Sequence, residues 1–282
     1  MIKVSILIVH YNTPGLLRQT LRAIRRAAPR CRYEILVVDN NPGCRVFDWL
    51  QTDFPEARVL ISESNLGFGQ GMNLAMREAK GELFFVFNPD TVLQPGTIEA
   101  LVDYLQEHEE VGLVGPKLCH PDGGLQYSCY RFMTPKMILY RRLPGLGRLP
   151  AVKRALRRYL MVDWDHLQVR AVDYLLGAAV MARRSAVEAV GGFDPQFFVY
   201  FEDQDWCWRF WRAGWHVHYL PTVSLIHYHR RETATGSFVS QLFNPLTRVQ
   251  MQSAWRYYRK WRGQNNPRLA IMKDEESLEA QS

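Results

Sequence analysis

The amino-acid sequence predicts an α/β fold, in which a mostly parallel β-sheet carries helices on both faces. Apolar runs of strand length alternate with helical patterns through the first 120 residues, and this alternation is typical of parallel sheets. The apolar runs are continuous and lack the polar alternation of a half-exposed strand. We therefore expect these strands to be buried on both sides.

The predicted elements of the first half follow one another in a regular order. Pro14 suits the first turn of a helix, where its missing N–H is not needed, and Leu17, Leu21 and Ile24 continue the helical spacing. Strands are expected at Val4–Val9, Ile35–Val38, Val59–Ile61, Leu83–Phe87 and Val111–Val114, with further helices around Val46–Leu50, Met72–Ala79 and Ile98–Leu105.

The second half has a different composition. Residues 130–170 are rich in Arg, Leu, Pro and Gly, and we interpret them as a variable insertion. Strands are expected at Val172–Ala182, Trp215–Leu220 and Val223–Ile226, and helices at Asp203–Ala213 and Asn244–Arg262, the last basic and aromatic. The polar tail after Pro267 is expected to be disordered. We predict one main domain over residues 1–242, in halves 1–120 and 121–242, followed by a helical extension and tail over residues 243–282.

Composition limits the class of protein. With 282 residues, 47% of them hydrophobic, the chain can bury a sizeable core in one large domain, or in one domain with an appendage. Its five cysteines form no Cys-x-x-Cys pair, so neither a zinc site nor a disulfide framework is indicated, and a reducing cytosol is the simplest setting. No apolar run reaches the ~18 residues of a membrane-spanning helix, and Val4–Val9 is too short for a signal peptide. The formal net charge of +7 is compatible with nucleic acid, an anionic membrane or a phosphorylated substrate.

Two carboxylates stand where predicted strands stop. Asp39 follows Ile35–Val38, and Asp90 comes shortly after Leu83–Phe87. Open α/β sheets bind ligands at the carboxyl ends of their strands, although Asp is also common after strands as a turn or helix-cap residue. The Asn88-Pro89-Asp90 segment offers amide and carboxylate oxygens, which are hard ligands suited to Mg²⁺ or Mn²⁺ bridging a diphosphate.

The segment Asn65–Asn73 has glycines at three alternate positions, Gly67, Gly69 and Gly71, before a predicted helix. Glycine lets backbone approach a ligand closely, and a helix N-terminus favours phosphate. A dinucleotide-binding loop is the competing interpretation, since Asp90 lies about 20 residues further on. The spacing is G-x-G-x-G rather than G-x-G-x-x-G, and the segment begins several residues after its strand, so we favour the first interpretation.

Three carboxylates, Glu202, Asp203 and Asp205, lie within four positions after an aromatic run. A carboxylate at a helix N-terminus is stabilised as the anion. The structural alternative is that Asp203 caps the helix while Asp205 pairs with Arg209 at i+4, and we accept it for Asp205. It explains less well a Glu-Asp pair beside so many aromatic side chains, where desolvation is costly.

A pair of histidines, His227 and His229, follows the predicted strand Val223–Ile226. Neutral histidine is a common transition-metal ligand. A buried histidine with satisfied hydrogen bonds is the more frequent role of any single one. The position just after a strand end keeps a role as metal ligand open.

Together these motifs resemble glycosyltransferase family 2, whose members share the nucleotide-binding GT-A fold, and most of all its bacterial rhamnosyltransferase branch. The resemblance runs from about Val4 to His227. Its motifs are Val9-His10-Tyr11-Asn12, Val38-Asp39-Asn40, Asn65–Asn73, Asn88-Pro89-Asp90, Gly177-Ala178, Gly191-Gly192-Phe193-Asp194 and Tyr200-Phe201-Glu202-Asp203. It implies a GT-A-type, Rossmann-like domain over residues 1–242, with a nucleotide-binding half (1–120), an acceptor and catalytic half (121–242), and a C-terminal helical extension.

The resemblance implies a donor site for a nucleotide-sugar. Asp39 would hydrogen-bond the base or ribose, while Tyr11 and Asn12 would line the nucleoside pocket. The full set of residues implied to bind the donor is Tyr11, Asn12, Asp39, Asn65, Gly71, Asn73, Asn88, Asp90, Gly177 and Ala178.

The resemblance also implies a metal site for Mg²⁺ or Mn²⁺. Asp90 would bind the metal within the family's Asp-x-Asp motif, which here has Asn88 at its first position, a usual variant in this branch. His227 would complete the metal–diphosphate site. Arg230-Arg231-Glu232-Thr233 replace the small residues that the family tends to have after this histidine, which leaves His229 as the alternative ligand.

Asp203 matches the family's catalytic base, and Glu202 is its rival. The implied reaction is an inverting transfer of a sugar from a dTDP- or UDP-linked donor to a hydroxyl of a lipid-linked or cell-surface glycan. In that reaction the carboxylate would remove the proton of the attacking hydroxyl. Rhamnose from dTDP-rhamnose is implied by the resemblance alone.

Three other functions are weighed against this one. A sugar-nucleotide nucleotidyltransferase usually needs a basic Gly-rich loop after the first strand, and His10–Gly15 contains no Lys or Arg. A non-catalytic nucleotide- or glycan-binding module would bind ligand without turning over the donor. An RNA-binding protein would explain the charge, but the aromatic residues have core-like spacing and no RNA-recognition motif occurs, so no nucleic-acid partner is expected.

Basic and apolar residues are interleaved in two segments. They are Arg141, Arg142, Leu143, Leu146, Arg148, Leu149, Lys153, Arg154, Leu156, Arg157, Arg158 and Leu160 in the first, and Trp255, Tyr258, Arg259, Lys260, Trp261 and Arg262 in the second. Such faces suit interfacial contact with anionic lipid, although amphipathic helices packed over a core are routine in soluble domains. We expect a cytoplasmic protein attached peripherally to the inner face of a bacterial cytoplasmic membrane. The oligomeric state, a homo-oligomer included, is left open.

Overall fold

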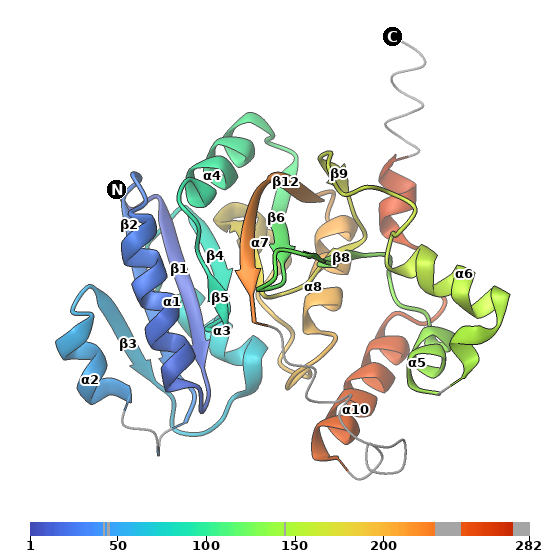
Figure 1. Ribbon diagram of the computed structural model, residues 1–282, viewed down its shortest axis with the longest axis horizontal. Helices are drawn as coiled ribbons and strands as arrows, with labels where there is room; N and C mark the ends of the chain where they lie inside the picture. The colour runs from blue at the N-terminus through green and yellow to red at the C-terminus, as the bar shows by residue number, and fades with distance from the viewer. Residues whose placement is uncertain (42, 44–45, 144, 229–243, 273–282) are drawn as a thin grey trace.

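The protein is described by a computed structural model that covers residues 1–41, 43, 46–143, 145–228 and 244–272. In this part of the chain a ten-stranded sheet carries helices on both faces, which confirms the predicted α/β fold (Figure 1). Its strands are β1 (Val4–His10), β2 (Tyr33–Asp39), β3 (Ala57–Ile61), β4 (Leu83–Phe87), β5 (Thr91–Val92), β6 (Val111–Cys119), β7 (Leu125–Gln126), β9 (Arg170–Ala171), β11 (Ala179–Arg183) and β12 (His216–His227). A separate antiparallel pair is formed by β8 (Cys129–Tyr130) and β10 (Tyr174–Leu175).

The order of strands brings several strand ends to one edge of the sheet. The order is β3-β2-β1-β4-β11-β6-β12-β5, with β7 beside β6 and β9 beside β12. The strands β1 to β4 are parallel, and β11 runs antiparallel to both β4 and β6. Because β12 is parallel to β6, the carboxyl ends of β1, β2, β4 and β12 and the start of β11 all lie at the same edge.

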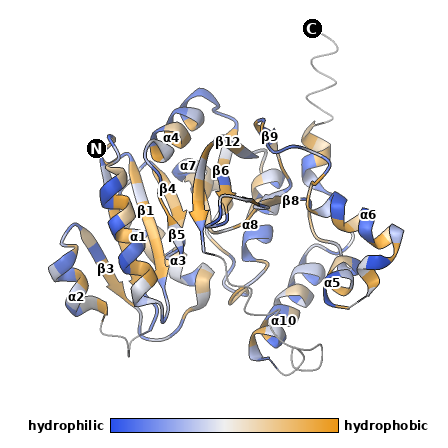
Figure 2. Cartoon of the chain, viewed as in Figure 1, coloured by the Kyte–Doolittle hydropathy of each residue, from blue (hydrophilic) through white to orange (hydrophobic). Residues whose placement is uncertain are grey.

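Alternate residues of the strands serve two hydrophobic clusters, one on each face of the sheet. Ile6 and Ile8 of β1 pack with helices α1 (Pro14–Ala27), α2 (Val46–Asp53) and α4 (Thr97–Glu107). Leu7 and Val9 pack with α3 (Gly67–Glu78), α7 (Arg184–Val190) and α8 (Glu202–Arg212). Burial on both sides explains the continuous apolar runs, which are visible as hydrophobic colour along the central strands in Figure 2.

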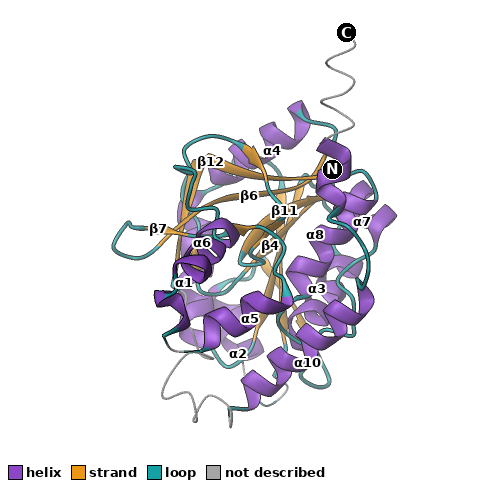
Figure 3. Cartoon of the chain, turned by 90° about the vertical axis from the view of Figure 1, so that its right-hand side faces the viewer, coloured by secondary structure: helices purple, strands orange, loops and turns teal. Residues whose placement is uncertain are grey.

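The remaining helices lie to one side of the sheet, on the right in Figure 1 and toward the viewer in Figure 3. They are α5 (Pro135–Arg142), the short 3₁₀ helix η1 (Leu146–Arg148), α6 (Pro150–Tyr159) and α10 (Pro245–Lys260). The predicted insertion is therefore mainly helical. The predicted C-terminal helix is confirmed, and the side chain of Asn244 caps it by accepting a hydrogen bond from the N–H of Leu246 (2.9 Å).

The structure corrects the boundary expected for the glycine-rich segment. Helix α3 begins at Gly67 rather than at Met72, so the three glycines lie in its first turns and not in a loop before it. A Cβ on Gly71 would stand 2.9 Å from a methyl group of Val9, and one on Gly69 would stand 2.9 Å from the Cβ of Phe193. Here glycine allows a helix to pack closely, a role that the sequence pattern alone does not separate from close approach to a ligand.

Two other expectations about secondary structure are also wrong. The predicted strand Val172–Ala182 is interrupted, because β10 pairs with β8 while β11 pairs with β4 and β6. Disorder after Pro267 is not found up to residue 272, because residues 267–272 are helical, and residues 273–282 lie outside the described part of the chain. Arg268 of this turn lies 3.2 Å from the buried carboxylate of Asp173, which anchors it.

Candidate active site

His10 and Asp39 meet at the ends of β1 and β2. The two residues are in register, both are buried, and His10 Nδ1 lies 3.4 Å from Asp39 Oδ1. The backbone N–H of Thr13 donates to His10 Nε2 (2.9 Å), so Nε2 is the acceptor and Nδ1 carries the proton directed at Asp39. Burial lowers the pKa of His10, in agreement with a neutral ring.

The carboxylate of Asp39 is oriented by its surroundings. The backbone N–H of Asn41 also donates to Oδ1 (3.3 Å), and no described residue donates to Oδ2. Tyr11, which is 48% exposed, and Asn12, with a left-handed φ of 55°, follow β1 beside it. Asn12 Oδ1 accepts a hydrogen bond from the side chain of Asn41. Three of the predicted donor-site residues are thus neighbours at this edge, and Oδ2 of Asp39 is available to a ligand.

Three other predicted donor-site residues make contacts within the fold. Asn65 Oδ1 accepts hydrogen bonds from Asn40 Nδ2 and from the N–H of Gly67 (3.0 Å each). The side-chain amide of Asn73 bonds both to the N–H (2.8 Å) and to the carbonyl (2.7 Å) of Phe193. Together with the packing of Gly71 against Val9 of β1, these contacts hold α3 in place against the sheet and against Phe193. Direct contact of Asn65, Gly71 or Asn73 with a nucleotide-sugar stays a prediction.

The second group of predicted residues lies at the ends of β4 and β12. His227 Nε2 is 3.3 Å from Asp90 Oδ1, and His227 Nδ1 is 2.9 Å from Gln126 Oε1. Donation from Nδ1 to Gln126 leaves Nε2 as the basic nitrogen, which is the form of imidazole that binds metals. The Oδ1 atoms of Asn88 and Asp90 are buried and accept no hydrogen bond from the described residues.

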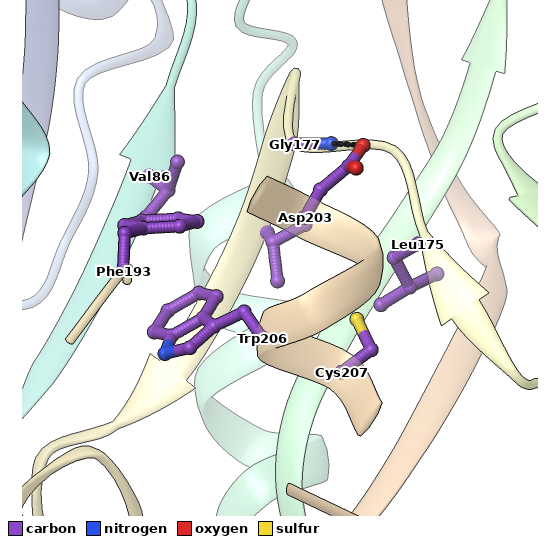
Figure 4. A pocket seen from close by; sticks show the side chains of 8 residues that line it. Val86, Leu175, Gly177, Phe193, Asp203, Trp206 and Cys207 are labelled. Atoms are coloured by element: carbon purple, nitrogen blue, oxygen red, sulfur yellow. Dashed lines mark hydrogen bonds between the residues drawn. The ribbon is translucent and has the colours of Figure 1, made fainter. Parts of the chain in front are cut away.

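Glu202 and Asp203 begin helix α8. The N-cap position is occupied by Phe201 rather than by Asp203, so the structural alternative, in which Asp203 caps the helix, does not hold. Asp203 Oδ1 accepts a hydrogen bond from the N–H of Gln204 (2.7 Å), and Oδ2 accepts one from the N–H of Gly177 (3.3 Å), drawn in Figure 4. These donors and the start of the helix stabilise the carboxylate as an anion.

A small pocket lies beside Asp203 (Figure 4). Its other lining residues are Val86, Leu175, Gly177, Val180, Phe193, Trp206 and Cys207. Burial in these surroundings raises the pKa of Asp203 to about 6 and that of Glu202 to about 8. Because backbone donors hold the anion of Asp203 while Glu202 Oε2 accepts no hydrogen bond from the described residues, the first proton leaves Asp203. The negative charge of the pair is therefore favoured at Asp203 and the proton at Glu202.

Gly177 and Ala178 connect the two parts of this edge. The N–H of Gly177 donates to Asp203, and the carbonyl of Ala178 accepts a hydrogen bond from the N–H of Asn88 (2.9 Å). The segment between β10 and β11 therefore links the carboxylate of Asp203 at the start of α8 to the segment that carries Asp90.

The predicted ion pair between Asp205 and Arg209 is confirmed at 2.9 Å, so Asp205 has a structural role.

Some residues that the sequence singles out are not part of the described structure. His229, Arg230 and Arg231 fall outside the described residues. Within the described part of the chain, no three His, Cys, Asp or Glu side chains gather into a metal-binding cluster. Three residues without an assigned role from sequence also contribute: His10, which orients Asp39; Asn40, which holds Asn65; and Gln126, which holds His227.

Comparisons with known proteins agree with this arrangement. A family model described as glycosyltransferase like family 2 matches residues 3–254. The N-acetylglucosaminyl-diphospho-decaprenol L-rhamnosyltransferase of Mycobacterium tuberculosis is 29% identical over 237 residues, which cover 80% of this chain and 76% of that protein. Rhamnosyltransferase WbbL of Escherichia coli is 25% identical over 271 residues, which cover 90% of this chain and 92% of that protein.

The solved structure of GalNAc-T7 with UDP, GalNAc and Mn²⁺ aligns with a TM-score of 0.61 at 15% identity. The alignment covers 86% of this chain and 48% of that one, so this chain spans about half its length. At this identity the likeness concerns the fold, which is of the GT-A type. Because the family model covers most of the sequence and the predicted motifs meet at one edge of a GT-A-type sheet, the chain belongs to glycosyltransferase-like family 2.

Proposed function

We propose that this protein is a metal-dependent, inverting rhamnosyltransferase that transfers rhamnose from dTDP-rhamnose to a hydroxyl of a lipid-linked or cell-surface glycan. The observation that carries the proposal is that the partly buried carboxylate of Asp203 lies at the same sheet edge as Asn88, Asp90 and His227. Two relatives named as rhamnosyltransferases support the choice of sugar. The diphospho-decaprenol in the name of one of them supports a lipid-linked acceptor.

Asp203 is the catalytic base of the proposed reaction. Its carboxylate takes the proton of the acceptor hydroxyl while the hydroxyl oxygen forms a bond to the anomeric carbon. The bond from that carbon to the diphosphate breaks on the opposite side, and the nucleoside diphosphate leaves with the electron pair. A single displacement through an oxocarbenium-like transition state inverts the anomeric configuration. The neutral acid of Glu202 adds no second negative charge next to the base.

The residues at the ends of β4 and β12 fit a divalent cation. Asn88 and Asp90 supply two buried oxygens without donors among the described residues, and His227 supplies a basic nitrogen 3.3 Å from Asp90. So few protein ligands suit Mg²⁺ or Mn²⁺ in a site where substrate phosphates complete the coordination. When bound, the cation would neutralise the charge that develops on the departing diphosphate.

Asp39 is expected to bind the base or ribose through Oδ2. Asp39→Ala should weaken binding of the nucleoside diphosphate by about 1–3 kcal/mol, the range for losing a hydrogen bond to a charged group. Isothermal titration calorimetry with dTDP and UDP measures the change. Glu107→Ala, an exposed carboxylate on α4, is the matched control and should bind as the wild type does. Equal affinity of the Asp39 variant and the wild type would reject this role.

The proposed function is tested with a panel of nucleotide-sugars. The protein is incubated with dTDP- and UDP-linked donors and Mg²⁺ or Mn²⁺, and release of the nucleoside diphosphate is followed. We expect slow hydrolysis of dTDP-rhamnose without acceptor and faster release with a glycan acceptor. A nucleotidyltransferase would instead exchange pyrophosphate into the donor, and a binding module would bind donors without turning them over.

We also propose that helices α5, α6 and α10 rest on an anionic membrane, where lipid-linked acceptors reside. Leu139, Leu149 and Trp255 are each more than half exposed on this side of the molecule. Exposed basic side chains accompany them at Lys136, Arg141, Arg148, Lys153, Arg154, Arg157, Arg158 and Arg259. Other members of the predicted faces, such as Leu156, Leu160 and Trp261, pack against the core. None of the described helices has the length and apolar character needed to cross a bilayer.

Flotation with anionic vesicles tests this attachment. Each basic residue near an anionic surface contributes about 1 kcal/mol, so Lys153→Gln/Arg154→Gln should weaken vesicle binding roughly 30-fold. Arg22→Gln/Arg26→Gln removes the same charge from the exposed face of α1 and should leave binding unchanged. Wild-type protein that fails to float with anionic vesicles at low salt would contradict the attachment.

A further inference from the structure

Helix α10 contacts the segment that leads into Glu202 and Asp203 at three places. The contacts are Ser253 Oγ to the carbonyl of Val199 (2.9 Å), the Arg256 guanidinium to the carbonyl of Gln196, and Lys260 Nζ to Asp194 Oδ2 (2.6 Å). Positions 253, 256 and 260 are spaced by three and four residues, so they form one face of the helix. That face therefore contacts residues 194–199 at both ends and near the middle.

Lys260 also joins this segment to helix α8. Its Nζ lies 2.7 Å from Asp205 Oδ1, and the indole N–H of Trp261 donates to the same oxygen (2.9 Å). Asp205 is fully buried and pairs on its other oxygen with Arg209. A charge buried in this way is stabilised only while its partners stay in place. The end of α10 is therefore fixed to α8 two residues beyond Asp203.

An apolar cluster reinforces the polar contacts. Phe197 and Phe201 of the segment pack with Trp208 of α8 and with Tyr257 and Trp261 at the end of α10. This cluster is distinct from the two clusters that cover the faces of the sheet. In Figure 1 α10 lies directly below α8, and Figure 3 shows the same arrangement from the side. The segment that leads into Glu202 and Asp203 therefore lies between α8 and α10.

The segment needs such support because its last two residues are strained. Tyr200 and Phe201 both have a φ of 70°, a left-handed conformation that is unfavourable for bulky side chains. Strained backbone of this kind persists only where the surroundings over-determine it. The left-handed pair turns the chain directly into Glu202, so its conformation sets where both carboxylates stand.

We propose that Ser253, Arg256 and Lys260 are positioning residues, which hold residues 194–201 in the strained turn that presents Glu202 and Asp203 at the sheet edge. The expected effect on turnover rests on the proposed function, whereas the expected effect on the conformation of residues 194–201 does not. Two of the three residues lie beyond residue 254, where the match to the family model ends. The C-terminal helix is on this account part of the catalytic apparatus as well as a surface element.

Hydrogen exchange tests the structural part. The N–H groups of Phe197 and Asp205 bond to the carbonyls of Asp194 and Phe201, so they report whether the turn opens. In Lys260→Met their exchange should accelerate at least ~10-fold through local opening, and Lys260→Arg should restore most of the protection. Arg259→Met, which alters an exposed neighbour stacked on Trp255, should exchange as the wild type does. Unchanged exchange in Lys260→Met would overturn the proposal.

Turnover tests the catalytic part. Misplacement of the base should lower kcat of Lys260→Met by about 10- to 100-fold, with the donor KM and the nucleotide affinity within about twofold of the wild type, since Asp39 is held by β1 and β2. A merely structural loss would lower the fraction of nucleotide-binding protein and leave kcat, counted per nucleotide-binding protein, at the wild-type value. Recovery of kcat in Lys260→Arg is the second result that separates a positioning role from a merely structural one.

A double variant tests the turn independently of Asp205. If Lys260→Met fails to fold because Asp205 loses a partner, Ser253→Ala/Arg256→Met loosens the same turn without altering the surroundings of that carboxylate, and the same two readouts decide. If the wild type turns over no donor, the proposed function fails while the exchange result still decides the structural part. Wild-type exchange and wild-type kcat in the double variant would refute the positioning role.

Discussion

Asp203→Asn is expected to lower kcat at least ~100-fold, the low end for losing a general base, while donor binding survives. The amide is nearly the same size as the carboxylate, and its single oxygen can keep the hydrogen bond from either Gln204 or Gly177, but it cannot take a proton from the acceptor. Steady-state kinetics with a saturating donor, together with calorimetric donor affinity, separates the two effects.

Glu202→Gln is the matched control for this variant, because it alters a carboxyl group one residue away that is neutral near pH 7. Its effect should be milder. In the wild type kcat should fall as the pH is lowered through about 6, because burial raises the pKa of Asp203 to that value and only the anion acts as a base. Near-normal rates in Asp203→Asn with no activity in Glu202→Gln would exchange the two roles. Activity in both variants would reject the mechanism.

Removal of the metal is expected to abolish turnover. Excess chelator should stop release of nucleoside diphosphate, and added Mg²⁺ or Mn²⁺ should restore it. Asp90→Ala should prevent this rescue at ordinary metal concentrations, because it removes the one carboxylate among Asn88, Asp90 and His227. Loss of charge neutralisation at the diphosphate is worth several kcal/mol of transition-state stabilisation.

The metal site is also tested by nucleotide binding, which does not depend on turnover. Binding of dTDP should strengthen with Mn²⁺ in the wild type and lose this dependence in Asp90→Ala, as followed by calorimetry. Asp103→Ala removes an exposed carboxylate on α4 and should keep both the metal dependence and the activity. Full turnover in excess chelator would contradict metal dependence.

The parallel sheet and the edge at which Asp39 and Asp90 lie were predictable from the sequence. Continuous apolar runs marked β1, β2, β4 and β6, and the rule for strand ends selected Asp39 and Asp90. The proximity of His227 to Asp90 came from the family resemblance. Local spacing could not supply it, since the two residues are brought together by the pairing of β5 with β12.

The contacts that orient these residues were not predictable. Gln126 reaches His227 only because β7 folds back on β6, and a two-residue strand has no periodic signal. Lys260 and Trp261 were assigned to a basic surface, but both contact the buried carboxylate of Asp205. Residue type alone does not show which face of an amphipathic helix is covered, since that depends on tertiary packing.

The glycines of α3 are a similar case. Their spacing was compatible with a ligand loop, and the structure shows them as points where the helix contacts Val9, Phe193 and Phe198. Both roles require the absence of a side chain. Only knowledge of what lies opposite each glycine separates them, and that is a property of the assembled fold.

The most direct test of glycosyl transfer by this site is the donor panel run on wild type and Asp203→Asn side by side. With dTDP-rhamnose, a divalent metal and a glycan acceptor, the wild type should release dTDP and form a glycoside whose anomeric configuration is opposite to that of the donor. Asp203→Asn should bind dTDP equally well and release it at least ~100-fold more slowly. A product with retained configuration, or equal rates in the two proteins, would contradict the account.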